Sequence, residues 1–287
     1  NDYCLSWQKE WSQNFNMIIA VESRRIFSNH FVPMVTPEGS VFNTVGYNQA
    51  HLQLRFSKEE IVTRGTFEKH YVYSKYPVAT IDLIGSIKGI GKNEYSYFRP
   101  ELSLHYTLTI PPVGLSKFDL NVGTIVGKVP YPMLKIHEGN GTYTFSRYAF
   151  NCMDYYEFAS DLWATFFWEH NFKGFFLGKI PLLKRLQWRE VASLKAAYGT
   201  VRSENNGIRD DDNFGSVMLF PEKMGKLNRP YVEMGAGITN IFRFLRVDAF
   251  WRMTHRYEVK DGVKVPHDNL SLIHISEPTS QAEISYA

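Results

Sequence analysis

The stretch "FLRVDAFWRMTHR", from Phe244 to Arg256, gives the clearest indication of the fold. In an extended strand, successive side chains point to opposite faces. One face of this strand would carry Leu245, Val247, Ala249, Trp251 and Met253. The other would carry Arg246, Asp248, Phe250, Arg252, Thr254 and Arg256. Two structures fit this pattern: a soluble sandwich whose apolar face meets the core, and a membrane barrel whose apolar face meets lipid while the charges line the lumen.

The same alternation recurs along the chain. In "ELSLHYTLTI", Leu102, Leu104 and Leu108 alternate with polar residues that include His105, and "YVEMGAGITN" places Glu233 on its polar face. The small residues of "GAGITN" are expected to allow close packing or a bend. About nine spanning strands follow, at 14–27, 47–57, 78–89, 97–110, 114–127, 154–170, 188–202, 230–240 and 243–256. No segment shows a convincing helical period, which predicts an all-β class.

Strand length separates the two structures. Soluble strands usually have about 5–6 residues, whereas a strand that crosses a bilayer at a tilt needs about 9–11. Several segments keep the alternation for that length. We therefore predict an antiparallel, up-and-down transmembrane β-barrel over residues 1–269, truncated at both ends. The rival prediction is a soluble β-sandwich that acts as a binding module for a carbohydrate or a protein ligand.

The connections between these strands differ in length at the two ends of the sheet. The links 28–46, 90–96, 128–153, 203–229 and 257 onward fall at one end, and most are long. The tight links 111–113 and 241–242 fall at the other, with two long exceptions at 58–77 and 171–187. Bacterial barrels have long extracellular loops and short periplasmic turns. We expect 128–153 and 203–229 to lie together at the extracellular rim, and 62–73 to form an excursion or a short hairpin that does not span.

The alternation also assigns residues to the two sides of the barrel. The lumen-facing polar row is expected to contain Arg246, Asp248, Arg252, Arg256, Glu233 and His105. The lipid-facing residues are expected to include Leu102, Leu104, Leu108, Val247, Ala249 and Trp251. The polar row is either a ladder of charges paired between strands or a surface that acts in selectivity or in docking a plug. In both cases Arg246 and Arg252 are expected to tolerate neutral polar replacement.

Composition and motifs favour binding, transport or membrane-protein assembly over catalysis. The chain has 287 residues, a net charge of +3 and two cysteines, with no basic block typical of nucleic-acid binding. No apolar run is long enough for a spanning helix, and the mean hydropathy is −0.28. The phosphate-loop pattern in "GSIKGIGKN" is broken, and no spacing predicts a catalytic residue, a metal site or a cofactor. "FFLGKIPLLKRLQWREV", from Phe175, has the composition of a short amphipathic link at a membrane surface, or of a turn packed under the barrel.

Three stretches together resemble a known family: "YPMLKIHEGNGTYTFSRYAFNCMDYYEFASD", "HNFKGFFLGKIPLLKRLQWREV" and "RPYVEMGAGITNIFRFLRVDAFWRMTHR". The family consists of Bacteroidota outer-membrane proteins described as carboxypeptidase-like regulatory domain-containing proteins. Its C-terminal barrel is a domain of unknown function that is distantly similar to the Omp85 and surface-antigen type. The resemblance implies a location in the outer membrane of a Gram-negative bacterium. Its implied partners are outer-membrane lipid and other outer-membrane or periplasmic proteins, and it supplies no catalytic residues.

The chain departs from this family at its C-terminal end. From Leu270 it reads "LSLIHISEPTSQAEISYA", which resembles the translation of a sequencing adapter rather than a last alternating strand. We therefore expect residues 270–287 to be non-native. Because "LSLIHIS" has a β-like composition, we also expect it to pair with the edge of residues 243–256, and we expect "EPTSQAEISYA" to be loose.

Overall fold

The structure is a computed structural model. It describes residues 2–12, 14–30, 32–64, 69–90, 93–142, 145–209, 211–227, 229–260, 263–267 and 269–276. Within these ranges, no helix has the length and apolar character needed to cross a membrane.

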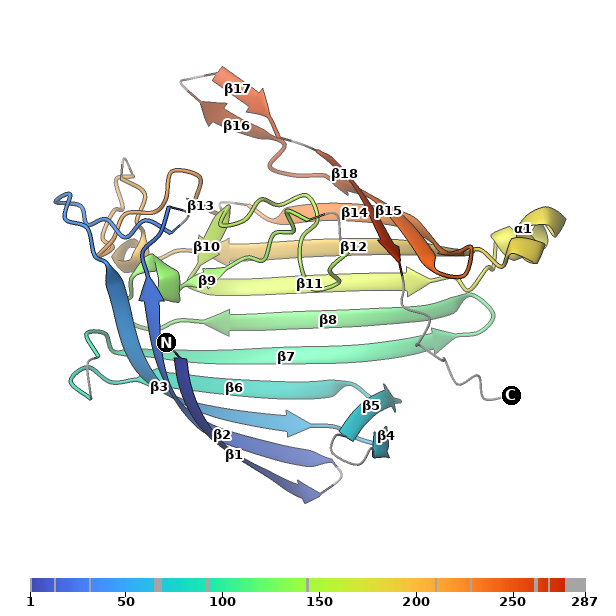
Figure 1. Ribbon diagram of the computed structural model, residues 1–287, viewed down its shortest axis with the longest axis horizontal. Coiled ribbons are helices and arrows are strands. Elements are labelled where there is room, and N and C mark those ends of the chain that lie inside the picture. The colour runs from blue at the N-terminus through green and yellow to red at the C-terminus, as the bar shows by residue number, and fades with distance from the viewer. Residues whose placement is uncertain are drawn as a thin grey trace.

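One antiparallel sheet of eleven strands dominates the fold (Figure 1). In sheet order the strands are β1 (Asp2–Ser12), β2 (Phe15–Phe27), β3 (Thr44–Phe56), β6 (Val78–Ser86), β7 (Tyr97–Ile110), β8 (Gly114–Thr124), β11 (Leu162–Asn171), β12 (Arg189–Thr200), β14 (Tyr231–Ile241), β15 (Leu245–Arg252) and β18 (Leu270–Ser276). The order of these strands across the sheet is the same as their order along the chain, so the up-and-down topology is confirmed. In the described residues β1 and β18 are the two edges, so the sheet is open and its closure into a barrel stays a prediction.

All nine predicted segments contain a strand of this sheet, with two corrections. The segment 154–170 begins its strand only at Leu162, because the chain before it takes part in a smaller sheet. The segment 243–256 is a strand only from Leu245 to Arg252. The prediction also missed β1, although Tyr3, Leu5 and Trp7 alternate there with polar residues.

Two hairpins stand outside the main sheet. β4 (Glu60–Arg64) and β5 (Lys69–Ser74) form the short, separate hairpin that was predicted near 62–73. β16 (Tyr257–Lys260) and β17 (Val263–Pro266) form a second hairpin between β15 and β18. Neither hairpin changes the up-and-down order of the main sheet.

Cross-strand pairing keeps one face of the sheet apolar across its whole width. Leu102 on β7 pairs with Val122 on β8, which pairs with Ala164 on β11. Further along, Met234 on β14 pairs with Trp251 on β15. Within the described ranges no protein covers this face, since Leu102 is 38% exposed and Trp251 is 44% exposed. A sandwich built on this face would bury these residues between two sheets.

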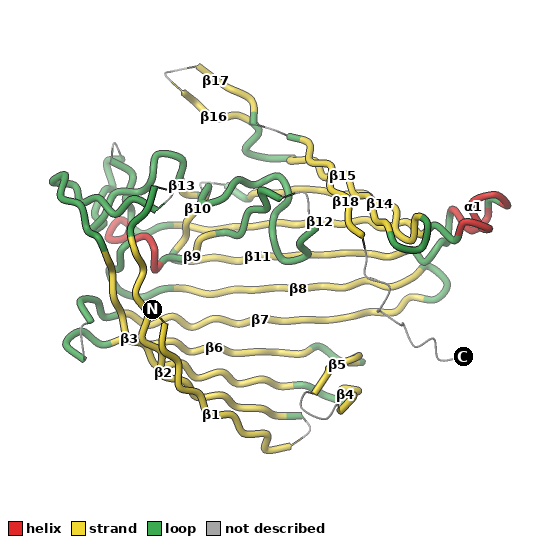
Figure 2. The backbone as a smooth tube through the Cα atoms, viewed as in Figure 1, coloured by secondary structure: helices red, strands yellow, loops and turns green. Residues whose placement is uncertain are grey.

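The opposite face is polar and concave. Arg246 on β15 reaches Glu169 on β11 at 2.8 Å, although three strand spacings of about 4.8 Å each separate these strands. Side chains that far apart meet readily only when the sheet curls toward them, as it does in Figure 2.

The long links pack together at one end of the sheet, as predicted. Val129 N donates to Asn205 Oδ1 at 2.9 Å, and the Tyr131 hydroxyl donates to Pro33 O at 2.9 Å. The links contain β9 (Lys135–Ile136), β10 (Phe158–Ser160), β13 (Gly225–Lys226), and the short helices η1 (Tyr131–Met133) and η3 (Ser203–Asn205). The main apolar core lies among them and includes Met34, Ile125, Tyr131, Ala159, Trp163 and Met218. The tight link 111–113 and the turn after β14 lie at the opposite end, with η2 (Leu177–Lys179) and α1 (Pro181–Leu186).

The C-terminal segment from Leu270 pairs with the predicted edge. β18 is antiparallel to β15, with Leu272 opposite Ala249. Such pairing is what an unpaired edge offers to any extended segment. Its adapter origin stays a prediction, which re-sequencing the gene across codon 269 would test. Residues 277–287 lie outside the described residues.

Candidate functional site

The predicted polar row divides into three groups. Glu233, Asp248, Arg246 and Arg252 come together on the polar face of β14 and β15 and are all buried, with Glu233 fully so. His105 lies on the same face, but on β7 and half-exposed. Arg256 does not belong to the row: it is exposed and lies beyond the last residue of β15. The six predicted lipid-facing residues all lie on the apolar face, with Val247 39% exposed.

The buried group is covered by part of the link between β8 and β11. We call the described residues 137–142 and 145–157 the in-folded link; it crosses over β11 and β12 in Figure 1, in green. Glu233 holds it by accepting hydrogen bonds from the backbone N–H groups of Asn151 at 2.8 Å and Cys152 at 3.0 Å. Lys195 on β12 donates to the carbonyl oxygens of Ser146, at 2.9 Å, and Ala149.

An ion pair fixes the C-terminal end of the in-folded link. Arg252 Nη2 lies 2.5 Å from Glu157 Oε1, and Arg252 Nη1 donates to Cys152 O at 3.1 Å. The Arg252 side chain is 1% exposed and that of Glu157 is 8% exposed, so both charges have left water and depend on each other. Arg252 is therefore a buried, ion-paired side chain and not a group exposed to an open lumen. Its tolerance of neutral polar replacement stays a prediction.

Arg246 has a different role in the same row. Its guanidinium contacts Asp248 at 2.6 Å on its own strand and Glu169 at 2.8 Å on β11. It also lies 4.1 Å from the ring centroid of Phe145 in the in-folded link. Arg246 is thus paired across strands, as in a charge ladder, whereas Arg252 and Glu233 contact the in-folded link. A role of the row in selectivity or in docking a plug stays a prediction.

Apolar contacts also hold the in-folded link against the sheet. Phe150 packs against Phe167 and Tyr231, with ring centroids 5.1 Å and 5.2 Å apart. A Cβ atom at Gly235 would collide with Ser193 and with the ring of Phe250. The small residues of "GAGITN" therefore allow close packing, as the sequence predicts.

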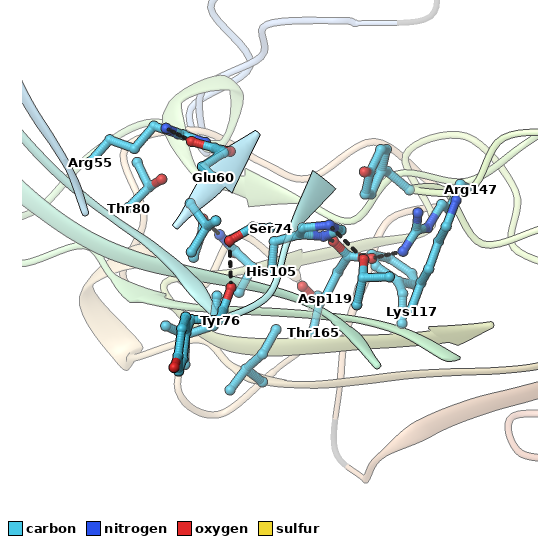
Figure 3. A pocket seen from close by; sticks show the side chains of 18 of the residues that line it. Arg55, Glu60, Ser74, Tyr76, Thr80, His105, Lys117, Asp119, Arg147 and Thr165 are labelled. Atoms are coloured by element: carbon cyan, nitrogen blue, oxygen red, sulfur yellow. Dashed lines mark hydrogen bonds and ion pairs between the residues drawn. The ribbon is translucent and has the colours of Figure 1, made fainter. Parts of the chain in front are cut away.

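The polar face of β7 and β8 remains open beside the in-folded link. A pocket of about 710 Å³ lies there, between the β4–β5 hairpin and residues 135–148 (Figure 3). Asp119 accepts from His105 at 2.5 Å and from Arg147 at 2.6 Å, and Arg55 pairs with Glu60 at 2.6 Å. The volume fits a small ligand or a short peptide segment.

Burial shifts the pKa values of His137 and Cys152 in the in-folded link. Burial, assisted by the charge of Lys135, lowers the pKa of His137 to about 3, so the ring is neutral at pH 7. Its Nε2 lies 2.9 Å from Ser160 Oγ. Burial raises the pKa of the Cys152 thiol to about 12, which makes it a poor nucleophile.

Sequence reasoning missed the partners of the polar row. Glu157, Lys195 and Glu169 were not assigned, although Lys195 interrupts the apolar run of "WREVASLKAAYG". That interruption could have indicated the site, because a lysine within an apolar strand needs a polar partner. Among the described residues, no group of three or more His, Cys, Asp and Glu side chains is arranged as metal ligands. In the acidic stretch Arg209–Asn213, Asp211 is ion-paired with Lys226.

Residues 14–204 match the model of the C-terminal domain of a family of unknown function, DUF5686. The chain belongs to this family. The DUF5686 domain of this chain is also similar in fold to a solved structure, that of BamA from Haemophilus ducreyi lacking POTRA domains 1-3. The TM-score is 0.54 at 9% sequence identity, over 96% of this chain and 53% of the BamA chain. The chain thus spans about half the length of that structure, and the likeness concerns fold alone. No curated protein matches the sequence.

Proposed function

We propose that this chain forms part of the wall of an outer-membrane β-barrel, with its apolar face in lipid and its polar face toward the lumen. The observation that carries the proposal is the apolar face itself, which extends over all eleven strands and has no protein layer on it among the residues that the structure describes. In water, an apolar surface of this size would be an aggregation liability. In the proposed barrel, strands beyond the described sheet complete the closure.

The proposed barrel works in outer-membrane assembly. Two observations support this role over that of an open pore. The in-folded link covers the polar face of β11, β12, β14 and β15, held by the buried Arg252–Glu157 ion pair and by hydrogen bonds between its backbone and Glu233 and Lys195, and the fold is similar to that of BamA. The second candidate is transport of a small ligand, which the pocket beside His105 favours.

Catalysis is not proposed, although a histidine and a serine lie side by side. His137 is 1% exposed and Ser160 is fully buried, so no substrate reaches them in this arrangement. The expected setting is the outer membrane of a Gram-negative bacterium of the Bacteroidota. Its lipid and its other outer-membrane or periplasmic proteins are the proposed partners, and no nucleic acid is among them.

Depletion of the full-length protein tests the proposed role. Loss of many unrelated outer-membrane proteins would support assembly, whereas loss of one nutrient's uptake, with stepwise conductance in planar bilayers, would support transport. Recovery of the protein from the soluble fraction after osmotic lysis would overturn the barrel itself and favour a β-sandwich binding module.

Cleavage of intact cells by trypsin tests the orientation. Arg209 is exposed in the link 201–230, whereas Asn205 and Asn206 are buried. We expect cleavage at Arg209 in intact cells. Cleavage there only after the outer membrane is permeabilised would reverse the topology.

A further inference from the structure

The link between β11 and β12 forms a cationic and apolar patch at the end of the sheet that has the tight turns. Residues 172–188 contain no Asp or Glu, and their four cations, Lys173, Lys179, Lys184 and Arg185, are all exposed. The apolar side chains between them are exposed as well: Phe176 by 54%, Ile180 by 48%, Leu182 by 71% and Leu186 by 41%.

The neighbouring turn extends the patch. Asn240 Nδ2 donates to Gln187 O at 2.8 Å, which joins the turn after β14 to the end of α1. In that turn Phe242 is 69% exposed, Phe244 is 44% exposed and Arg243 is exposed. We call eleven exposed residues the rim patch. They are the cations Lys173, Lys179, Lys184, Arg185 and Arg243, and the apolar residues Phe176, Ile180, Leu182, Leu186, Phe242 and Phe244. Figure 1 shows α1 projecting beyond the ends of the strands on this side.

The rim patch is built as a defined surface rather than a loose loop. Phe172 N donates to Glu190 O at 2.9 Å, and the Glu190 carboxylate accepts from Leu177 N. The ring centroids of Phe175 and Phe176 lie 5.0 Å apart, and Lys179 Nζ lies 4.2 Å from the Phe175 centroid. The two helices of the link, η2 and α1, bury none of their residues against the rest of the described chain.

We infer that the rim patch binds the surface of a bilayer that contains anionic phospholipid. Exposed aromatic and aliphatic side chains between lysines and arginines are what an interfacial segment needs, because the apolar groups enter the headgroup boundary while the cations contact phosphate. The absence of carboxylates from 172–188 fits an anionic surface, and the patch continues the apolar face of β14 and β15 at its end. The inference rests on the proposed function, since a barrel would hold this rim at the level of the headgroups.

A reporter at the most exposed apolar position tests the inference. The full chain with Cys4→Ser and Leu182→Cys is labelled with a polarity-sensitive fluorophore and placed in nanodiscs of phosphatidylethanolamine, with or without phosphatidylglycerol. The native Cys152 is half-buried and has a raised pKa, so it competes little for the label. We expect a blue-shifted emission with phosphatidylglycerol that weakens at high salt.

Charge reversal separates lipid binding from general stickiness. The variant Lys179→Glu, Lys184→Glu, Arg185→Glu should lower the apparent affinity for phosphatidylglycerol by at least about tenfold, since each cation near an anionic surface contributes substantially. The matched control reverses three exposed lysines at the opposite end, Lys88→Glu, Lys128→Glu and Lys223→Glu, and should leave the emission unchanged.

The outcomes distinguish the inference from the proposed function. If the chain inserts into the nanodisc, as judged by protease protection of the strands, but the reporter stays in water with both lipids, the inference is wrong and the barrel stands. Equal shifts in the variant and its control would also overturn the inference. If the full-length protein, with the strands that complete the barrel, does not insert, the proposed function fails and the inference falls with it.

Discussion

Two halves of the same sheet have the same alternating pattern, but the polar face is covered in one half and open in the other. On β12, β14 and β15 the polar face is covered by the in-folded link, and its charges are buried in pairs. On β7 and β8 the polar face borders a pocket of about 710 Å³, and the His105 side chain remains 42% exposed. Alternation therefore predicts which face a side chain occupies. Whether other parts of the chain cover that face determines how much the side chain contributes to stability.

The covered half should be the more sensitive to loss of a charge. We expect Arg252→Ala to lower the free energy of unfolding by about 3–5 kcal/mol, because Glu157 would be left buried without its partner. Urea unfolding of the protein in lipid vesicles measures this loss. The double variant Arg252→Met, Glu157→Met leaves no unpaired charge and should recover most of it. Equal losses in both variants would show that packing, and not the ion pair, holds the link.

The apolar face should reject charge in a way that depends on its surroundings. We expect Val247→Arg or Ala249→Arg to cost about 2–4 kcal/mol if the face lies near the middle of a bilayer. At a surface in water, the same change at the 39% exposed Val247 would stay within about 0.5 kcal/mol. The control Ser103→Arg points into the pocket and should be tolerated. A small effect at Val247 would break the barrel proposal.

Acid should loosen the covered half first. The pKa of His137 is lowered to about 3 in the folded state, against about 6.5 when unfolded. Between these values the unfolded state binds more protons, so stability falls as the pH drops below 6.5 and the loss is complete near pH 3. At pH 5 it amounts to about 2 kcal/mol. Unfolding curves at pH 5 and 7.5 measure this difference, and His137→Gln should reduce it; an unchanged difference in that variant would assign the loss to other groups.

The open half should give the smallest effect. His105→Ala removes a contact with Asp119 that is half-exposed, and Asp119 keeps its ion pair with Arg147. We expect a loss of less than about 1 kcal/mol, measured in the same urea experiment. A loss as large as that of Arg252→Ala would remove the distinction between the two halves.

Much of the fold could be predicted from the sequence because alternation is a local property. Val247 and Asp248 are neighbours in the chain, so their opposite faces follow from the geometry of one strand. The same logic predicted the up-and-down order, the separate β4–β5 hairpin and the apolar face. It failed where alternation ends: Arg256 lies past the strand, and β10 belongs to another sheet.

The tertiary structure alone decided which polar residues carry the site. Arg252 and Glu157 are 95 residues apart in the chain, and Cys152 lies 81 residues from Glu233. Nothing local in the sequence specifies that the in-folded link turns back over the sheet, because this path depends on long-range contacts such as those of Arg252 and Glu233. The sequence by itself determined the two faces, since a side-chain period of two is fixed by the backbone of each strand. Only the folded chain decided that one part of the polar face is buried and another is open, because burial depends on what is brought to it from elsewhere.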